Sequence, residues 1–341
     1  MARVAINGFG RIGRATFKIL MDTPGLEVMA INDLVPIDNL AYMLKFDSVY
    51  GRYERDVKAG PDGLIVDGRQ VRVLAEKDPA KLPWREMDMD VVFECTGRFT
   101  EKEGLLKHIE AGAGNVILSA PSKSPDIGTI VHGVNKPDEE ARAISCASCT
   151  TNSITPVMEI IGRRIGIKKA VMTTVHAYTS TQALVDGPSS KFRRGRAAAV
   201  NIVPTSTGAA IATTKALPQY KGKFDGMAFR VPVPVGSISD ITLLVERPTT
   251  KEEVADIFKE EAGTERYGKV LAVSEEPLVS SDIIKDPHAA VIDLEMIQVV
   301  DGDLVKIMSW FDNEWGYSSQ MVREALEILK IPMLRTKTVG V

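Results

Sequence analysis

The chain has 341 residues, of which 44% are hydrophobic, 26% charged and 6% aromatic. This composition is typical of a globular protein long enough for two domains with separate cores. The formal net charge of -3 provides no overall positive field that would attract nucleic acid or an anionic membrane. Three cysteines are too few for a disulfide framework, so we expect a cytoplasmic protein with reduced thiols.

The N-terminus and the apolar segments indicate neither secretion nor membrane insertion. Val4 to Ile6 run into a glycine-rich turn too early for the apolar region of a signal peptide. No apolar run reaches the ~18 residues that a membrane span needs. We expect no membrane partner and no dedicated nucleic-acid site. Basic residues do cluster locally, at Lys191, Arg193, Arg194 and Arg196.

The first half of the chain alternates short apolar runs with helix-like segments, a pattern typical of βαβ units and a parallel sheet. The expected strands are Val4–Ile6, Leu26–Ile31, Val91–Glu94 and Asn115–Leu118. The expected helices are Arg11–Met21 and Lys102–Ala111.

The pattern changes after Cys149. A long helix is expected over Ile154–Ile165, with Thr151, Asn152 and Ser153 as capping candidates. Further strands are expected over Ala170–His176, Met227–Pro232, Ile238–Val245, Ala289–Leu294 and Leu304–Trp310. Further helices are expected over Thr207–Leu217, Glu252–Glu261 and Ser318–Leu329, the last packing back on the first domain. Longer strands with fewer helices favour a mixed, largely antiparallel sheet in an α+β domain.

Gly8, Gly10 and Gly13 form a G-x-G-x-x-G pattern between the first expected strand and helix. These glycines allow a tight turn, a close approach of a pyrophosphate, and close packing of helix on strand. Asp33 follows the next strand, where a carboxylate would bind the adenosine ribose and repel a 2′-phosphate. The pattern predicts an NAD site rather than an NADP site; a structural glycine turn and a loop acid without ligand are the alternatives.

These features predict an α/β protein of two domains. Residues 1–150 would form a Rossmann-type NAD-binding domain, completed by a C-terminal helix at 315–331. Residues 151–314 would form the catalytic domain.

Cys149 precedes the long expected helix, and a helix N-terminus lowers the pKa of a thiol by stabilising its thiolate. It is therefore a candidate nucleophile, with a small buried core residue as the alternative. His176 ends an apolar strand and could serve as the base that a thiol needs; a structural histidine is the alternative. His108, in a helix, and His288, in a turn, are expected to be solvated surface residues.

Cys146 and Cys149 form a C-x-x-C pair, but the chain offers no second pair of ligands at matching spacing, so we expect no metal site. If the stretch between them is extended, their Cα atoms lie ~10 Å apart, too far for a disulfide. We interpret Cys146 as structural, with a role as redox partner left open.

Six stretches spread over nearly the whole chain carry a family resemblance. They are INGFGRIGR (6–14), IND (31–33), KFDSV (45–49), ECTG (94–97), ASCTTN (147–152) and FDNEWGY (311–317). Together they resemble the phosphorylating glyceraldehyde-3-phosphate dehydrogenases of the bacterial, glycolytic type.

The resemblance implies oxidation of D-glyceraldehyde 3-phosphate to 1,3-bisphosphoglycerate with reduction of NAD. Cys149 would attack the aldehyde to form a thiohemiacetal, and its N–H would stabilise the oxyanion. His176 would activate the thiol and exchange protons during hydride transfer. Inorganic phosphate would then attack the thioester. A homotetramer is also implied, in which the loop over residues 179–201 meets a neighbour's cofactor site.

The resemblance assigns binding residues as well. Those for the cofactor are Gly8, Gly10, Arg11, Ile12, Gly13, Asp33, Thr96, Ser119, Asn313 and Tyr317, with Asn313 bonding the nicotinamide amide. Those for the substrate phosphate are Thr179 and Arg230. Those for the attacking phosphate are Ser148, Thr150, Thr207 and Gly208, with Arg194 nearby.

The chain departs from the common family pattern at Ser153, where a second cysteine is frequent, so its oxidation behaviour is expected to differ. Leu34 and Pro188 stand where NADP-using members tend to carry small hydroxylated residues, which favours NAD. Ser189 and Ser190 leave that preference unsettled.

Two other functions remain open. The first is an erythrose-4-phosphate dehydrogenase of the same family, which hydrolyses its thioester and fits Thr179 and the run Thr205–Gly208 less well. The second is a catalytically silent binding protein on the same fold. The tail from residue 330 to 341 gives no functional signal.

Overall fold

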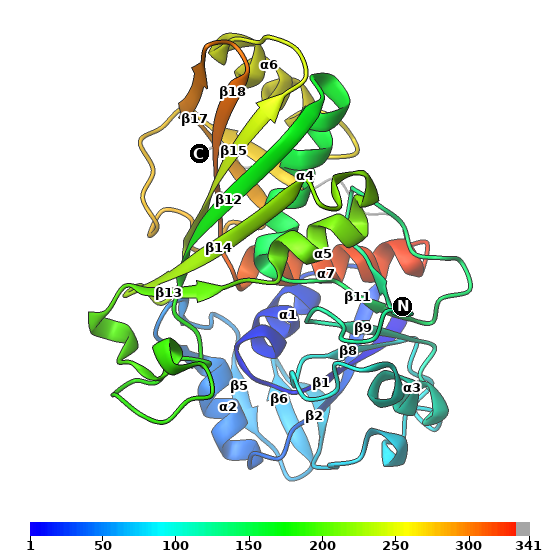
Figure 1. Ribbon diagram of the computed structural model, residues 1–341. Helices are drawn as coiled ribbons and strands as arrows, with labels where there is room; N and C mark the ends of the chain where they lie inside the picture. Colours follow the sequence, from blue (N-terminus) through cyan, green and yellow to red (C-terminus); the bar gives the residue numbers. More distant parts are fainter. Residues whose placement is uncertain (332–341) are drawn as a thin grey trace. The chain divides into compact units, whose positions relative to one another are not determined.

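The computed structural model describes residues 1–331, which divide into two compact units coloured by position along the chain in Figure 1. Unit 1 comprises residues 1–128, 138–145 and the described residues from 321 onward. Unit 2 comprises residues 129–137 and 146–320. The tail, to which the sequence assigns no role, lies outside the described residues from position 332. Within residues 1–331, no helix is long and apolar enough to cross a membrane.

Unit 1 is built on a nine-stranded sheet in the order β10-β11-β9-β8-β1-β2-β7-β6-β5. Its strands are β1 (Ala2–Asn7), β2 (Leu26–Asn32), β5 (Val57–Ala59), β6 (Gly63–Val66), β7 (Arg69–Leu74), β8 (Val91–Glu94), β9 (Asn115–Leu118), β10 (Gly128–Thr129) and β11 (Ala143–Ser145). Its helices are α1 (Arg11–Met21), α2 (Ile37–Lys45) and α3 (Lys102–Glu110), with a 3-10 turn η1 (Pro79–Lys81). A separate pair, β3 (Phe46–Asp47) and β4 (Gly51–Arg52), forms a small hairpin.

The centre of this sheet is parallel and apolar. β1 pairs in parallel with β2 on one side and with β8 on the other. Val4, Ala5 and Ile6 are completely buried because the parallel sheet is covered on both faces. The strand order reverses beside β1, and such a reversal opens a crevice at the carboxyl ends of the strands where dinucleotides bind.

His108 corrects one prediction. It was expected on the surface, but its side chain is completely buried. Leu105 and His108 are three residues apart on α3 and both face the interior, where Trp84 and Glu94 give the imidazole its hydrogen-bond partners. A polar residue can occupy such a position when its ring nitrogens are paired.

Unit 2 is built on a seven-stranded sheet in the order β13-β14-β12-β15-β18-β17-β16. Its strands are β12 (Ile167–Ala177), β13 (Val203–Ser206), β14 (Phe224–Val231), β15 (Ser237–Val245), β16 (Leu271–Ser274), β17 (Ala290–Val300) and β18 (Leu304–Phe311). Its helices are α4 (Cys149–Arg164), α5 (Ala209–Ala216), α6 (Lys251–Ala262) and the start of α7 (Trp315–Ile328), with the short 3-10 turns η2 (Phe192–Gly195), η3 (Ala198–Val200) and η4 (Pro218–Tyr220). Four of its strand pairs are antiparallel and two are parallel, which confirms the predicted mixed sheet.

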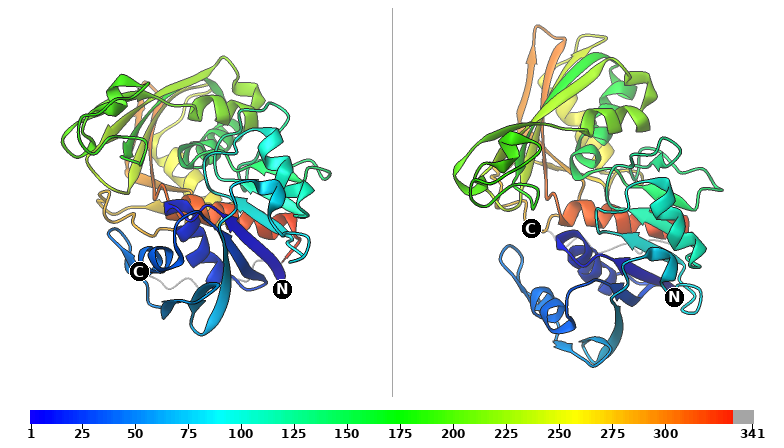
Figure 2. Two further views of the ribbon diagram at one scale, coloured as in Figure 1. Left: turned by 90° about the horizontal axis from the view of Figure 1, so that it is seen from below. Right: turned by 60° about the horizontal axis from the view of Figure 1, so that its bottom comes forward.

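The core of unit 2 lies between this sheet and its helices. Along β15, buried and half-buried residues alternate, as expected for a sheet that packs on one face. Ile241 and Leu243 on that face join one apolar cluster with Ile161 of α4 and Phe258 of α6. Figure 2 gives two further views of the strands and of the helices that cover them. The packed sheet thus holds two positions in place, the carboxyl end of β12 and the start of α4. Polar groups can be positioned at both.

Candidate active site

The loop before Cys149 is held from several directions. Ala147 adopts a left-handed backbone conformation with φ of +55°, a strained geometry for a residue with a side chain. The hydroxyl of Tyr317 donates to the Ala147 carbonyl at 3.1 Å, and the Asn152 side-chain amide donates to the Cys146 carbonyl at 2.8 Å. These hydrogen bonds hold the backbone of Cys146 and Ala147 and so set the position of the residues that follow, Ser148 and Cys149.

Cys149 is the first residue of α4. Ser148 is the N-cap, and its hydroxyl accepts a hydrogen bond from the Thr151 N–H at 3.2 Å. The prediction that α4 begins at Ile154 was wrong by five residues, because Asn152 and Thr155 bond back to the backbone and so remain within the first turns. The helix N-terminus thus lies directly at the sulfur.

The stretch between Cys146 and Cys149 is not extended, contrary to the geometry assumed from the sequence, because Ala147 reverses its direction. All three cysteines lie within the described residues, and none of them forms a disulfide there. Cys146 itself is buried.

Strand pairing brings the second candidate group to the thiol. His176 lies near the end of β12, and the parallel neighbour β14 places Arg230 directly beside it. The His176 Nε2 atom lies 3.3 Å from the Cys149 sulfur. The two predicted catalytic side chains, far apart in the sequence, are therefore in hydrogen-bond contact.

Three contacts bear on the tautomer of the ring. His176 Nδ1 lies 2.7 Å from the Ala177 carbonyl oxygen, which only accepts, and 2.8 Å from Arg230 Nη1, which only donates. Arg230 Nη1 also donates to the Ala177 oxygen at 2.8 Å. We assign the proton to Nδ1, whose nearer partner is the carbonyl oxygen, so that Nε2 keeps a lone pair facing the sulfur.

The electrostatics favour a neutral pair. Burial lowers the pKa of His176 to about 3, and the positive charges of Arg230 and Arg194 act in the same direction. Burial also raises the pKa of the Cys149 thiol, although Arg230 and hydrogen bonds from Thr150 oppose this. The lowered thiol pKa expected from the helix N-terminus is therefore not found, because desolvation outweighs it. The imidazole is a free base beside a protonated thiol.

Arg230 lies beside this pair, and Thr179 follows His176 by three residues; both are candidates for binding an anion. Among the described residues, the buried Nε of Arg230 has no hydrogen-bond partner, so one of its donors is available to a ligand. The Thr179 N–H donates to the Gln182 side-chain oxygen at 3.0 Å, which closes a turn. Gln182 was missed in the sequence because no motif marks it.

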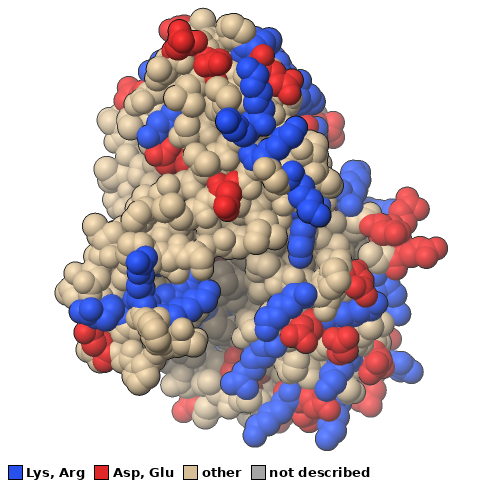
Figure 3. Space-filling model, in the orientation of Figure 1, with Lys and Arg blue, Asp and Glu red and all other residues tan. Residues whose placement is uncertain are grey.

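A second set of anion-binding candidates surrounds Arg194. Its Nε donates to the Thr205 hydroxyl at 3.0 Å, and the Thr207 hydroxyl accepts from the Ala209 N–H at 3.1 Å. Gly208 is the N-cap of α5, so the helix N-terminus is open there. Arg194 borders a pocket of about 610 Å³ that also includes Phe192, Thr205 and Met227. Figure 3 shows Lys and Arg side chains gathered over the segment around η2.

Ser148 and Thr150, also assigned to the attacking phosphate, flank the nucleophile. Ser148 is the N-cap of α4, and Thr150 is buried within its first turn. Thr150 hydrogen bonds act on the Cys149 sulfur, so this part of the set does lie at the thiol.

The glycine turn in unit 1 has the geometry that a dinucleotide requires. Gly8 has a φ of +95°, which only glycine adopts readily. A Cβ on Gly13 would lie 2.0 Å from the Gly8 carbonyl oxygen, so no side chain fits there. A Cβ on Gly10 would meet no described atom within 4 Å, which leaves open space beside the start of α1. Free N–H groups at that helix start suit a phosphate.

The other predicted cofactor residues of unit 1 lie along the same strand ends. Asp33 accepts from the Phe9 N–H at 2.7 Å, so its carboxylate is anchored to the glycine turn. Arg11 pairs with Asp47 at 2.7 Å, while Ile12 follows it on α1. The Thr96 N–H donates to the Glu94 side chain, and the Ser119 N–H donates to the Glu94 backbone carbonyl.

Two predicted cofactor residues belong to unit 2. The Asn313 side-chain oxygen accepts from the Gly236 N–H at 3.2 Å and from the Ser237 hydroxyl at 3.0 Å, which fixes its amide orientation. The Ser237 oxygen also accepts from the Ala177 N–H, so Asn313 is tied to the strand that carries His176. Tyr317 instead supports the Ala147 turn. Ser237 has no sequence signal; only the register of β15 reveals its role.

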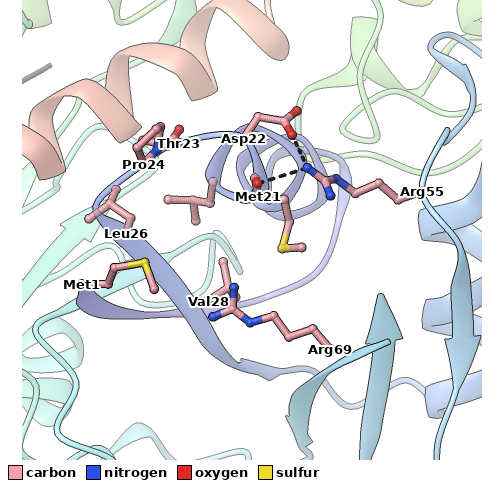
Figure 4. A pocket seen from close by; sticks show the side chains of 10 residues that line it. Met1, Met21, Asp22, Thr23, Pro24, Leu26, Val28, Arg55 and Arg69 are labelled. Carbon is pink, nitrogen blue, oxygen red and sulfur yellow. Dashed lines mark hydrogen bonds and ion pairs between the residues drawn. The ribbon is translucent and has the colours of Figure 1, made fainter. Parts of the chain in front are cut away.

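A further pocket in unit 1 lies away from these residues. It has a volume of about 330 Å³ and lies at the end of α1 and the start of β2, bordered by Met1, Leu26 and Arg55 (Figure 4). Arg55 donates to the Asp22 carboxylate and to the Met21 carbonyl there. Because these are the amino ends of the strands, the pocket is not the dinucleotide crevice.

Known proteins match nearly the whole chain. A family model described as "Glyceraldehyde 3-phosphate dehydrogenase, NAD binding domain" matches residues 2–102, and one described as "Glyceraldehyde 3-phosphate dehydrogenase, C-terminal domain" matches residues 148–313. Glyceraldehyde-3-phosphate dehydrogenase 2 of Bacillus subtilis is 48% identical over 94% of both chains. The enzyme of Geobacillus stearothermophilus is 47% identical over 94% of this chain and 96% of its own. That of Clostridium pasteurianum is 45% identical over 97% of this chain and 99% of its own.

Two matched domains and relatives of this similarity agree with the glycine turn and with the paired thiol and imidazole. The chain belongs to the glyceraldehyde 3-phosphate dehydrogenase family and binds NAD.

Proposed function

We propose that this protein is an NAD-dependent, phosphorylating dehydrogenase that converts D-glyceraldehyde 3-phosphate and inorganic phosphate to 1,3-bisphosphoglycerate. The observation that carries the proposal is the 3.3 Å contact between the Cys149 sulfur and His176 Nε2, beside the charges of Arg230 and Arg194. The names of the relatives support the substrate.

In the first step the Cys149 thiol gives its proton to His176 Nε2 while the sulfur bonds to the aldehyde carbon. The carbonyl oxygen becomes an oxyanion, which the Cys149 N–H at the start of α4 is placed to stabilise. Return of the proton from the imidazole to that oxygen gives a neutral thiohemiacetal. A free-base imidazole is the protonation state that this step needs.

In the second step His176 removes the hydroxyl proton of the thiohemiacetal. NAD, when bound, would supply the acceptor for the hydride of the same carbon, and Cys149 would then hold the product as a thioester. The residues present fit this cofactor, because Gly13 admits no side chain, Gly10 leaves open space and Asp33 is anchored beside them. Asn313, with its oxygen fixed by two donors, would orient the nicotinamide amide.

In the third step an inorganic phosphate oxygen attacks the thioester carbon, and the carbon–sulfur bond breaks to give an acyl phosphate. Ser148, Thr150, Thr207, Gly208 and Arg194 would hold this phosphate, while Thr179 and Arg230 would hold the substrate phosphate. Arginine offers charge-assisted donors for such anions, and hydroxyl groups adjust their position. The leaving sulfur regains its proton from His176.

The proposed division of labour follows the sequence prediction: residues 1–150, completed by the helix at 315–331, would bind NAD, and residues 151–314 would carry the chemistry. We further propose a homotetramer. Its support is the loop over residues 179–201, in which Leu184, Val185 and Phe192 are 78%, 73% and 88% exposed. Exposed apolar groups of this density mark a contact surface. A cytoplasmic location stays a prediction.

Initial rates of NADH formation with and without phosphate test the proposed function. Phosphorolysis predicts that turnover with glyceraldehyde 3-phosphate stops when phosphate is withheld. Turnover that continues at an unchanged rate without phosphate would instead indicate hydrolysis of the thioester, as in an erythrose-4-phosphate dehydrogenase. A binding protein without catalysis would form no NADH in either condition.

A further inference from the structure

A buried polar network lies beneath the carboxyl ends of β1, β2 and β8 in unit 1. Asn7, Asn32, Glu94 and His108 are its members, and each is at most 4% exposed. Asn7 donates to the Glu94 carboxylate at 2.5 Å, and Asn32 donates to the Asn7 side-chain oxygen at 2.7 Å. None of these side chains takes part in the proposed reaction, so the network needs another explanation.

Trp84 determines the tautomer of His108. The indole Nε1 lies 3.0 Å from His108 Nδ1, and an indole N–H can only donate. Nδ1 must therefore carry a lone pair, which places the proton on Nε2. That atom lies 3.2 Å from the Glu94 carboxylate and donates to it. The His108 ring thus has a hydrogen-bond donor, Trp84, on one side and an acceptor, Glu94, on the other.

Glu94 is the centre of the network. Its carboxylate accepts from Asn7, from His108, from the Thr96 N–H at 2.8 Å and from the Thr96 hydroxyl. All four donors are neutral groups, and four is about the number that the two oxygens can accept. Both oxygens of this buried side chain therefore have hydrogen-bond partners.

The network is in direct contact with the glycine turn. A Cβ on Gly8 would lie 2.7 Å from the Thr96 nitrogen, so the turn packs against the backbone that Glu94 holds. The Gly8 N–H donates to the Asn32 carbonyl at 2.8 Å. The next residue after Asn32 is Asp33, whose carboxylate accepts from the Phe9 N–H. Hydrogen bonds thus connect Glu94 to the ends of β1 and β2 as well as to its own strand β8.

We propose that Trp84, His108 and Glu94 are positioning residues for NAD, which set the geometry of the glycine turn through Thr96 and Asn7. Trp84 holds the ring of His108, His108 and Asn7 hold the carboxylate, and the carboxylate holds Thr96 against Gly8. The proposal rests on NAD binding by this domain and is independent of the thiol chemistry in unit 2.

The test compares two substitutions of one residue. His108→Gln keeps an N–H donor for Glu94 and an oxygen acceptor for Trp84, whereas His108→Phe keeps the ring shape and loses both. By titration calorimetry with NAD, we expect His108→Phe to raise Kd about tenfold, because it leaves buried groups unpaired, and His108→Gln to stay within about threefold. At saturating NAD, the kcat and the KM for the aldehyde should remain near those of wild type. When the NAD concentration is varied instead, the KM for NAD should rise.

Two further variants complete the experiment. Glu94→Gln should weaken NAD binding more than His108→Phe. The amide nitrogen of the glutamine is a donor, and it would face groups that also donate. Glu261→Gln is the control, because Glu261 is a buried carboxylate in unit 2 paired with Arg163 and Arg164, and its loss should lower stability with NAD affinity unchanged. The proposal is overturned if His108→Phe binds NAD like wild type. It is also overturned if the Phe and Gln variants lose affinity equally. Loss of turnover with intact NAD binding would concern only the proposed function.

Discussion

At the scale of single residues, the reaction depends on the protonation of two neighbouring groups. Burial lowers the pKa of His176 to about 3, and it raises that of the Cys149 thiol. Before the reaction, a neutral Cys149 thiol therefore lies beside a neutral His176 imidazole. The thiolate forms only as the sulfur attacks the aldehyde carbon. A base that is unprotonated at neutral pH does not need to lose a proton first.

Replacement of the base tests this account. His176→Asn keeps a polar side chain but cannot accept the thiol proton. We expect kcat to fall about a hundredfold or more, because general-base catalysis contributes that amount, while the Kd for NAD stays unchanged. Steady-state kinetics together with calorimetry measures both. A variant that retains kcat within a few fold would exclude His176 as the base.

The same histidine predicts how stability depends on pH. The unfolded chain binds a proton at His176 near pH 6.5, whereas the folded chain does so only near pH 3. The stability contributed by the neutral ring is thus present above pH 6.5 and is lost as the pH falls toward 3. Between pH 7 and pH 5, wild type should lose about 2 kcal/mol more than His176→Asn in denaturant unfolding. Equal losses in the two proteins would contradict the lowered pKa.

At the scale of elements, two glycines of one turn have separable roles. Gly13 lies where a Cβ would be 2.0 Å from the Gly8 carbonyl oxygen, whereas a Cβ on Gly10 would meet no described atom within 4 Å. The packing of α1 on β1 requires Gly13, whereas Gly10 leaves space that the proposed NAD site would use.

Alanine at each position distinguishes these roles. Gly13→Ala should reduce the free energy of unfolding by about 1–3 kcal/mol, because the methyl group overpacks the turn. Gly10→Ala should leave the melting temperature near that of wild type and still weaken NAD binding, since its methyl group occupies the ligand side. Thermal unfolding and NAD titration of both variants provide the comparison. If Gly10→Ala destabilises the protein as much as Gly13→Ala does, the assignment fails.

Strong periodicity made several elements predictable. The helix Arg11–Met21 and the strands Val91–Glu94 and Asn115–Leu118 have the predicted bounds. Residues 33–90 gave no such signal, because β5 to β7 are short and β7 buries only one of its six residues. Helix α2 was missed in the same region.

Residue types and sequence motifs made part of the candidate site predictable. A helix start and a strand end made the contact between Cys149 and His176 feasible, and the family resemblance assigned the two residues their roles. The left-handed Ala147 and the supporting Ser237 were not predictable, because each depends on tertiary contacts that the local sequence does not encode. The raised thiol pKa was missed since desolvation depends on the packed surroundings.

At the scale of the whole molecule, the loop over residues 179–201 would connect catalysis to the proposed assembly. It carries Thr179 and Arg194 as well as the exposed Leu184 and Phe192. If the proposed tetramer buries these apolar groups, assembly would also stabilise the segment that carries two of the proposed phosphate-binding residues.

A charge in the loop tests this connection. Phe192→Asp places a carboxylate on a side chain that is 88% exposed in the single chain, so the fold of the chain itself should be retained. We expect sedimentation to show a smaller assembly than wild type, with a raised KM for phosphate. A wild-type protein that sediments as a monomer would refute the tetramer.

The covalent step through Cys149 is the central claim, and intact-mass spectrometry tests it most directly. When NAD and glyceraldehyde 3-phosphate are supplied without phosphate, the protein should gain the mass of the acyl group on Cys149 and release about one NADH per chain. Added phosphate should remove that mass, and Cys149→Ser should never acquire it while still binding NAD. An unmodified wild-type protein that nevertheless forms NADH would contradict the account.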